Sequence, residues 1–60
     1  MQQESQKEEV LEYIAKEPGL IFRQLRFRLE MNESTLNKAL INLTKHNLIK
    51  KDNEFRYFVK

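Results

Sequence analysis

Hydrophobic residues recur at helical spacing in the first part of the chain. Ser5 is followed three positions later by Glu8, a capping-box spacing that favours a helix start just ahead of an apolar segment. Apolar side chains then fall on one face of this helix, at Val10, Leu11 and Ile14. Because Pro18 and Gly19 interrupt helices, the sequence predicts a first helix that ends just before them.

A second, shorter helix is predicted from about residue 23 to residue 30. Leu25 and Leu29 lie one turn apart on its buried face, and Met31 is expected to pack in the turn that follows. Asn32 is a favourable N-cap for a third helix, because its side-chain oxygen can accept a hydrogen bond from the backbone N–H of Thr35. A tight turn would therefore join the second and third helices.

The third helix is predicted to have one apolar face and one polar face. Its apolar face carries Leu36, Ala39, Leu40 and Leu43. Asn47 follows where a left-handed residue is expected, a conformation that Asn tolerates. Leu48 and Ile49 are then expected to turn back into the core. The opposite face of the helix groups Ser34, Lys38, Ile41, Asn42 and Lys45, with Asn37 at its margin.

Residues 49–60 alternate in the manner of a short β-hairpin. One face of its second strand, expected to be core, carries Phe55, Tyr57 and Val59, and the other carries Arg56, Phe58 and Lys60. An extended stretch from Leu20 to Phe22 is expected to add a third strand. Together these elements predict an α+β fold, a winged helix-turn-helix with three helices and a small two- or three-stranded antiparallel wing. Residues 1–60 would form one domain, with residues 1–4 as a disordered tail.

Length and composition narrow the classes of function. A chain of 60 residues buries only about 60% of the surface that its unfolded form exposes, too little for a deep substrate pocket. The chain has no cysteine and only one histidine, His46, so disulfides and thiolate or histidine metal clusters are not expected. We therefore expect no enzyme activity, no cofactor, no metal, no small-molecule substrate and no membrane segment, in a reducing intracellular setting.

The charges are distributed unevenly along the chain. Residues 1–22 carry five glutamates and two lysines, whereas residues 23–60 carry nine lysines and arginines and four acidic residues. The basic part is the part that holds the predicted helix-turn-helix and wing. One side of a small domain could therefore face phosphates while the acidic first helix stays away from them.

The segment from Leu25 to Ile49 reads L-x-x-x-L-x-M-N-x-S-T-L-x-K-x-L-x-x-L-x-x-x-x-L-I. It resembles, without a gap, the helix-turn-helix core of the MarR- and ArsR-type winged-helix regulators. In this resemblance Ser34 and Thr35 open the recognition helix, and Lys38 stands where a basic contact residue is common. The scaffold positions are Leu25, Leu29, Met31, Leu36, Leu40, Leu43, Leu48 and Ile49.

Four residues depart from the pattern of that family. Arg26 replaces a small residue and Glu30 replaces the turn glycine, which together suggest a modified turn. Ile21 occupies the usual Ser or Thr cap of the second helix, a loss of about 1 kcal/mol. Glu33 places a carboxylate at the start of the third helix, which favours the helix dipole but would repel a phosphate there.

The resemblance implies a DNA-binding regulator, or the DNA-binding part of a larger assembly, in the cytoplasm with the nucleoid or in the nucleus. The third helix, about residues 33–46, would enter the major groove of double-stranded DNA, with the wing on the backbone. The DNA-binding residues expected on this basis are Ser34, Thr35, Asn37, Lys38, Ile41, Asn42, Lys45, Lys50, Lys51 and Arg56. Hydration of a polar helix face, and protection of an edge strand by lysines, are the structural alternatives for these residues.

Two other functions remain open at the level of sequence. A protein-interaction module, forming a homodimer or binding a partner protein, would use apolar residues off the predicted core faces, namely Ile21, Phe27 and Phe58. A Z-alpha type domain, which binds left-handed duplex, is the second alternative. The stretch from Leu36 to Ile41 resembles its recognition helix, with Asn37 at the matching polar position, but Ile41 stands where that family has Tyr.

Overall fold

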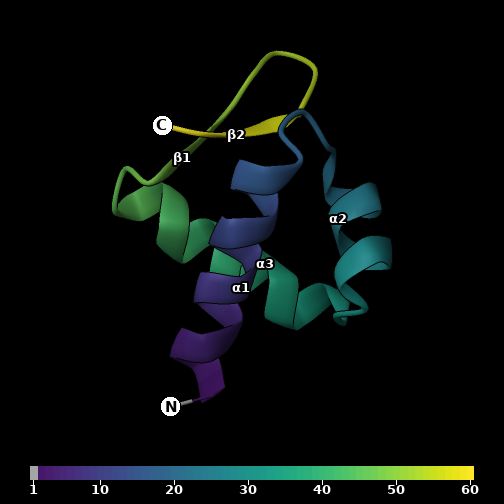
Figure 1. Ribbon diagram of the computed structural model, residues 1–60, viewed down its shortest axis with the longest axis vertical. Helices are drawn as coiled ribbons and strands as arrows, with labels where there is room; N and C mark the ends of the chain where they lie inside the picture. Colours follow the sequence, from purple (N-terminus) through teal and green to yellow (C-terminus); the bar gives the residue numbers. More distant parts are fainter. Residues whose placement is uncertain (1) are drawn as a thin grey trace.

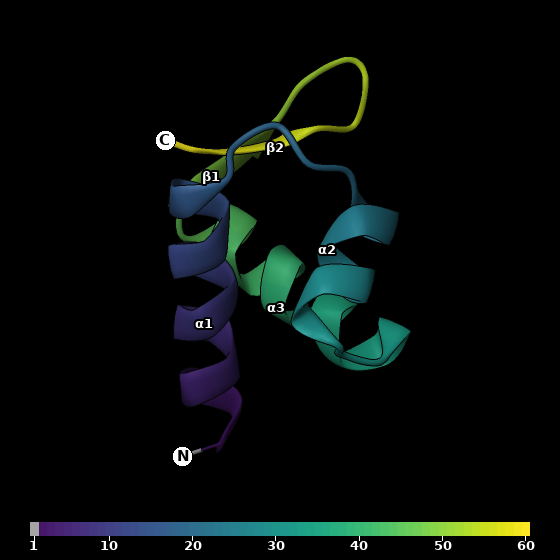
Figure 2. The same ribbon diagram turned by 45° about the vertical axis from the view of Figure 1, so that its right-hand side comes forward.

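The computed structural model describes residues 2–60, with side chains from residue 6 onward, and combines three helices with a small antiparallel sheet (Figure 1). The elements are α1 (Gln2–Lys16), α2 (Phe22–Leu29), α3 (Glu33–Lys45), β1 (Ile49–Lys51) and β2 (Tyr57–Val59). α1 packs on α3 and β2, and the hairpin of residues 49–59 lies at the end away from the N-terminus (Figures 1 and 2). The predicted α+β class is confirmed. Within the described residues, no helix is both long and apolar enough to cross a bilayer.

α1 begins earlier than its sequence predicts. The helix runs from Gln2, so the predicted start at Ser5 falls inside it, and residues 2–4 of the predicted tail are helical. Met1, also part of that tail, lies outside the described residues. The chain reverses at Gly19, whose φ of 91° is one that L side chains rarely adopt. The ring of Phe58 lies 3.7 Å from the position that a Cβ of Gly19 would occupy, so this turn also packs against the hairpin.

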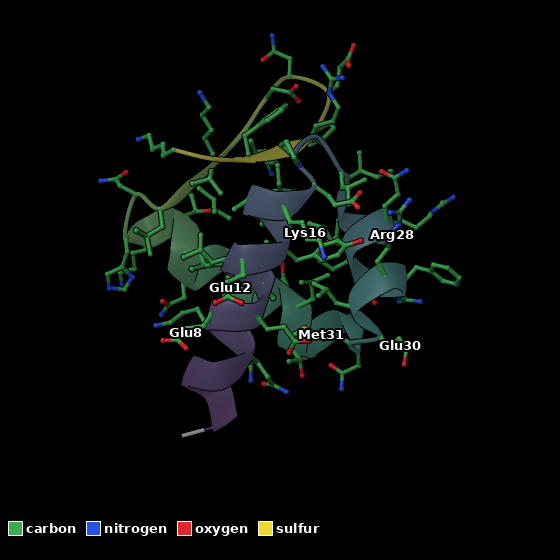
Figure 3. The ribbon with its side chains drawn as sticks, in the orientation of Figure 1. Glu8, Glu12, Lys16, Arg28, Glu30 and Met31 are labelled. Atoms are coloured by element: carbon green, nitrogen blue, oxygen red, sulfur yellow. The ribbon has the colours of Figure 1, made fainter. Side chains whose placement is uncertain are left out.

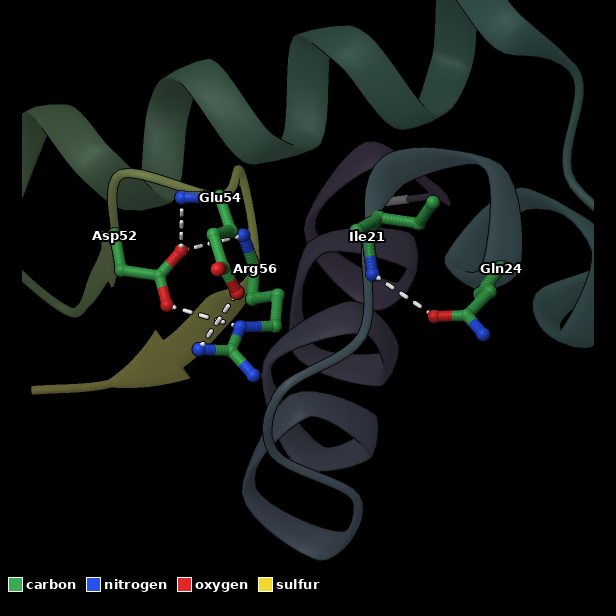
Figure 4. Close-up of polar contacts among 5 residues, drawn as sticks. All are labelled: Ile21, Gln24, Asp52, Glu54 and Arg56. Carbon is green, nitrogen blue, oxygen red and sulfur yellow. Dashed lines mark hydrogen bonds and ion pairs between the residues drawn. The ribbon is translucent and has the colours of Figure 1, made fainter.

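α2 has an unusual residue at each end. Ile21 holds the N-cap position in extended backbone (φ −89°, ψ 170°), but its side chain has no acceptor for an orphan N–H. The side chain of Gln24 accepts from the N–H of Ile21 at 3.2 Å, so only half of a capping box forms (Figure 4). At the other end Glu30 is left-handed (φ 54°, ψ 40°). The turn therefore has the backbone that a glycine favours, and the predicted modification of the turn affects its energy more than its geometry.

α3 is capped as the sequence predicts. The side chain of Asn32 accepts a hydrogen bond from the N–H of Thr35 at 2.8 Å. After α3 the chain turns through Asn47, whose φ of 60° confirms the predicted left-handed residue. One face of α3 is buried as predicted, through Leu36, Ala39, Leu40 and Leu43.

The hairpin pairs β1 and β2 with three residues each. In the antiparallel register Ile49 faces Val59 and Lys51 faces Tyr57. The predicted third strand is reduced to a single bridge between Leu20 and Tyr57, because Phe22 already belongs to α2. Two backbone hydrogen bonds of 2.9 Å hold this bridge, from the N–H of Tyr57 to the oxygen of Leu20 and from the N–H of Gly19 to the oxygen of Tyr57.

The core lies between the three helices and the sheet. Its buried members are Val10, Ile14, Leu25, Leu36, Ala39, Leu40, Leu43, Ile49 and Tyr57. Three residues that were predicted to lie in the core are exposed. Leu48 is 42% exposed, because it precedes β1 in the turn, and only Ile49 returns to the core. Phe55 is 64% exposed because it lies in the hairpin loop, before β2 and its alternation begin, and Val59 is 40% exposed at the end of the short sheet.

Candidate nucleic-acid interface

The outward surface of α3, which consists of Ser34, Lys38, Ile41 and Lys45, is open to solvent. All four residues are exposed, and the side chain of Ile41 is 59% exposed although it is apolar. The buried leucines on the opposite side of the same helix fix this orientation, since positions three and four apart share a face. The described part of the chain therefore leaves a polar, lysine-bearing helix face uncovered.

Three further predicted contact residues flank the outward surface of α3. Asn37 is exposed, whereas Thr35 and Asn42 are half-buried. The N–H of Thr35 is occupied by the cap of Asn32. Asn42 Oδ1 is buried and has no hydrogen-bond partner within the described residues. The structure thus makes Asn37 the more accessible of the two asparagines, although the sequence placed Asn37 at the margin of the polar face.

A groove of about 480 Å³ separates α3 from the hairpin. It is lined by Asn37, Leu40, Ile41, Thr44, Lys45, Lys51 and Tyr57. The groove brings Lys45 of α3 and Lys51 of β1 to one surface, as the sequence prediction requires. Thr44 was not predicted to take part, because the sequence does not determine which flank of α3 the hairpin approaches.

Aromatic rings hold Lys51 in place on the hairpin. Its Nζ lies 5.3 Å from the ring centroid of Phe55 and 5.9 Å from that of Tyr57, within the range of cation–π attraction. Burial raises the pKa of the Tyr57 hydroxyl above its ordinary value of 10.0, so the ring stays neutral beside the lysine. Lys50 lies opposite Phe58 in the register and is exposed.

The predicted phosphate contact Arg56 is already paired with acidic side chains of its own hairpin. Its Nε lies 3.0 Å from Asp52 Oδ2, and its Nη2 lies 3.1 Å from Glu54 Oε1 (Figure 4). Two carboxylates therefore offset one guanidinium at the hairpin tip. Among the three wing residues predicted to contact DNA, Lys50 and Lys51 form no ion pair in the described part of the chain, whereas Arg56 forms two.

Two departures from the family pattern face each other at the start of α3. Arg26 Nη1 of α2 lies 4.0 Å from Glu33 Oε1, and both side chains are more than half exposed. The positive charge of Arg26 thus makes the potential at this end of α3 less negative than Glu33 alone would make it. The sequence showed both residues as separate departures, since it does not reveal that they are neighbours.

The three residues predicted for a partner surface do not lie together as one exposed group. Phe27 is 82% exposed on α2. Ile21 is half-buried at the cap of α2, and Phe58 is half-buried with its ring over Gly19. The expectation that Ile21 and Phe58 lie exposed, off the core, is therefore wrong, since both are half-buried and the ring of Phe58 packs over Gly19.

No protein-family model, no curated protein and no solved structure matches the chain. Among the described residues, no three His, Cys, Asp or Glu side chains come together as metal ligands. The interpretation of the site therefore depends on its own geometry and charge.

Proposed function

We propose that this protein is a winged helix-turn-helix domain that binds double-stranded DNA, as a regulator or as part of a larger assembly. The observation that carries the proposal is the surface shared by α3 and the hairpin, where Lys45 and Lys51 line one groove beside the outward surface of α3. An exposed helix with a hydrophobic rear face is the element that fits the width of a major groove. Lysines on such a helix and on the hairpin beside it suit the phosphate backbone that borders the groove.

The proposed contacts divide into base edges and backbone. Lys38 and Asn37 are exposed on α3 and carry donors that suit guanine and adenine, respectively. Ile41 would meet a thymine methyl. The backbone contacts would come from Ser34, Thr35, Lys45, Lys50 and Lys51. Asn42 and Arg56 contribute less in this proposal, because one is half-buried and the other is paired with Asp52.

Affinity should be weak and strongly dependent on salt. A single copy offers roughly 4 to 6 phosphate contacts, and those made by lysines release condensed counterions when they form. Useful sequence specificity in a domain of this size needs a second copy or a larger assembly on the DNA.

The test is a titration of fluorescein-labelled duplex DNA, followed by anisotropy at several salt concentrations. Lys38→Gln and Lys45→Gln should each weaken binding. Because Lys45 is assigned to a phosphate, its loss should also reduce the slope of log K against log salt by about one. Lys16→Gln is the matched control, because Lys16 is also exposed but lies on α1. Equal affinity of the three variants and the parent would overturn the proposal, as would tighter binding to left-handed duplex than to ordinary duplex.

A further inference from the structure

Phe27 and its neighbours form an exposed surface that the proposed DNA contacts do not use. The ring of Phe27 is 82% exposed, an unusual state for an aromatic side chain of this size. Arg23 lies one helical turn before it, and Arg26 is adjacent. α2 carries three arginines and no acidic residue between Phe22 and Leu29. We call the surface of Arg23, Arg26 and Phe27 the α2 knob.

A groove of about 500 Å³ lies between α1 and α2. Its apolar lining is provided by Tyr13 and Leu29, which are both half-buried. The charged residues that line it are Glu9, Glu12, Lys16, Arg28 and Glu30. We call it the α1–α2 groove.

The charge of the α1–α2 groove is dominated by its carboxylates. Of its two cations, Arg28 is already engaged, because its Nη1 lies 3.3 Å from Glu17 Oε1 and 3.4 Å from the hydroxyl of Tyr13. Lys16 is the other cation of the lining. Glu9 and Glu12 form no ion pair in the described part of the chain. Figure 3 shows Glu8 and Glu12 along one side of α1, Lys16 on the side toward Arg28 of α2, and Glu30 just after the end of α2. An apolar floor with acidic residues on its rim suits an apolar side chain flanked by cations.

We propose that the α2 knob of one molecule docks into the α1–α2 groove of a second copy of this chain. Phe27 would cover Tyr13 and Leu29, while Arg23 faces the carboxylates of α1. The exposed Arg26 lies between these carboxylates and Glu33 of its own molecule, 4.0 Å away. The complementarity of charge is the argument for a second copy, since the chain itself carries both the basic knob and the acidic groove. In the proposed arrangement each contact joins one knob to one groove of the next molecule, so it is heterologous and leaves one knob and one groove free at the ends of each assembly.

Such an assembly is weak in free solution and sensitive to salt. The contact uses one aromatic side chain and a few exposed ion pairs, which salt screens. Molecules bound at neighbouring positions on a polymer such as DNA would be held at a high effective concentration, and the same contact would then act cooperatively. The docking itself does not depend on DNA.

The experiment is sedimentation velocity without DNA, at low salt and over a range of protein concentrations. The parent chain should form dimers and larger species as its concentration rises. A knob variant, Arg23→Gln with Phe27→Ala, and a groove variant, Glu9→Gln with Glu12→Gln, should each remain monomeric. Their equimolar mixture should form a discrete dimer and nothing larger, because it contains only one intact knob and one intact groove per pair. Circular dichroism of each variant verifies that the exposed changes leave the helices intact.

Leu48→Ala is the matched control, because Leu48 is an exposed apolar residue outside both surfaces. It should assemble like the parent. The proposal is overturned if the parent stays monomeric, if either double variant assembles like the parent, or if the mixture stays monomeric. Since no DNA is present, these outcomes are independent of the titration that tests the proposed function.

Discussion

The carboxylate of Asp52 binds Arg56 through both its backbone and its side chain. Asp52 Oδ1 accepts hydrogen bonds from the N–H groups of Arg56 and Glu54, each at 2.9 Å, while Oδ2 faces Arg56 Nε at 3.0 Å (Figure 4). One side chain thus holds the loop that connects β1 and β2 and also pairs with the guanidinium of Arg56. The conformation of the hairpin tip depends on the charge state of Asp52.

The first prediction is a change of the hairpin tip in acid. The pKa of Asp52 is lowered from 3.8, chiefly by the hydrogen bond from the N–H of Arg56. Because the folded pKa is lowered, the carboxylate stabilises the hairpin above its ordinary pKa, and this contribution is lost as the pH falls through the folded value. The amide shifts of Glu54 and Arg56 in NMR spectra should therefore move together, with a midpoint below pH 3.8.

Asp52→Asn provides the control for this titration. Its side chain can still accept from the loop N–H groups but has no charge to lose, so the two amides should not titrate over the same range. A midpoint at or above 3.8 in the parent protein would show that the hairpin does not favour the charged form of Asp52.

Helix positions and caps could be predicted from the sequence because they depend on local spacing. The buried face of α3 follows from the period of its leucines, and the Asn32 cap and left-handed Asn47 follow from single residue types in their local context. The start of α1 was misplaced, since a capping-box spacing also occurs inside helices. Local sequence rules therefore predict most of the scaffold that orients the outward surface of α3.

Properties that depend on how elements meet in space could not be predicted in this way. Phe55 continues the alternation of side chains along β2 in the sequence. It lies in the loop before that strand, however, where successive side chains do not alternate between two faces. Arg56 is a residue type that commonly contacts phosphate. Its pairing with Asp52 could not be predicted, because the pair depends on the conformation of the loop. The contact between Arg26 and Glu33 likewise appears only when α2 and α3 are placed beside each other. Charges near a candidate site are therefore less predictable than the helix that carries them.

The second prediction concerns the cap of α3. Asn32→Ala removes the acceptor for the N–H of Thr35 and should lower the free energy of unfolding by about 1 kcal/mol. Urea denaturation followed by circular dichroism measures this loss. Ser34→Ala is the control in the same helical turn, and we expect a change within roughly 0.5 kcal/mol, because Ser34 is exposed and caps nothing. Equal effects of the two changes would contradict the assigned cap.

The third prediction is that Glu30→Gly stabilises the protein. Left-handed backbone costs a residue with a Cβ roughly 1 to 2 kcal/mol. Replacement by glycine recovers this free energy, and the greater freedom of glycine in the unfolded chain offsets only part of the recovery. The change also removes a carboxylate from the C-terminal end of α2, where negative charge is unfavourable. We expect the free energy of unfolding to rise by about 0.5 to 1 kcal/mol in urea denaturation.

Asn47→Gly is the comparison for Glu30→Gly. Asn47 has a similar φ of 60°, but Asn tolerates this conformation better than Glu does, so the gain should be smaller. A larger gain at residue 47 than at residue 30 would argue against backbone strain as the source of the effect.

The fourth prediction separates backbone strain from side-chain contact at Phe55. This residue has a φ of 63° in the hairpin loop, at a position where such loops favour glycine. Phe55→Ala removes the ring and its contact with Lys51 but keeps the Cβ that makes this backbone unfavourable, whereas Phe55→Gly removes both. In urea denaturation the glycine variant should therefore be more stable than the alanine variant by about 0.5 to 1 kcal/mol. If alanine proves equal or better, the loop does not hold residue 55 in the left-handed region in solution, and the orientation of the Phe55 ring toward Lys51 would need to be revised.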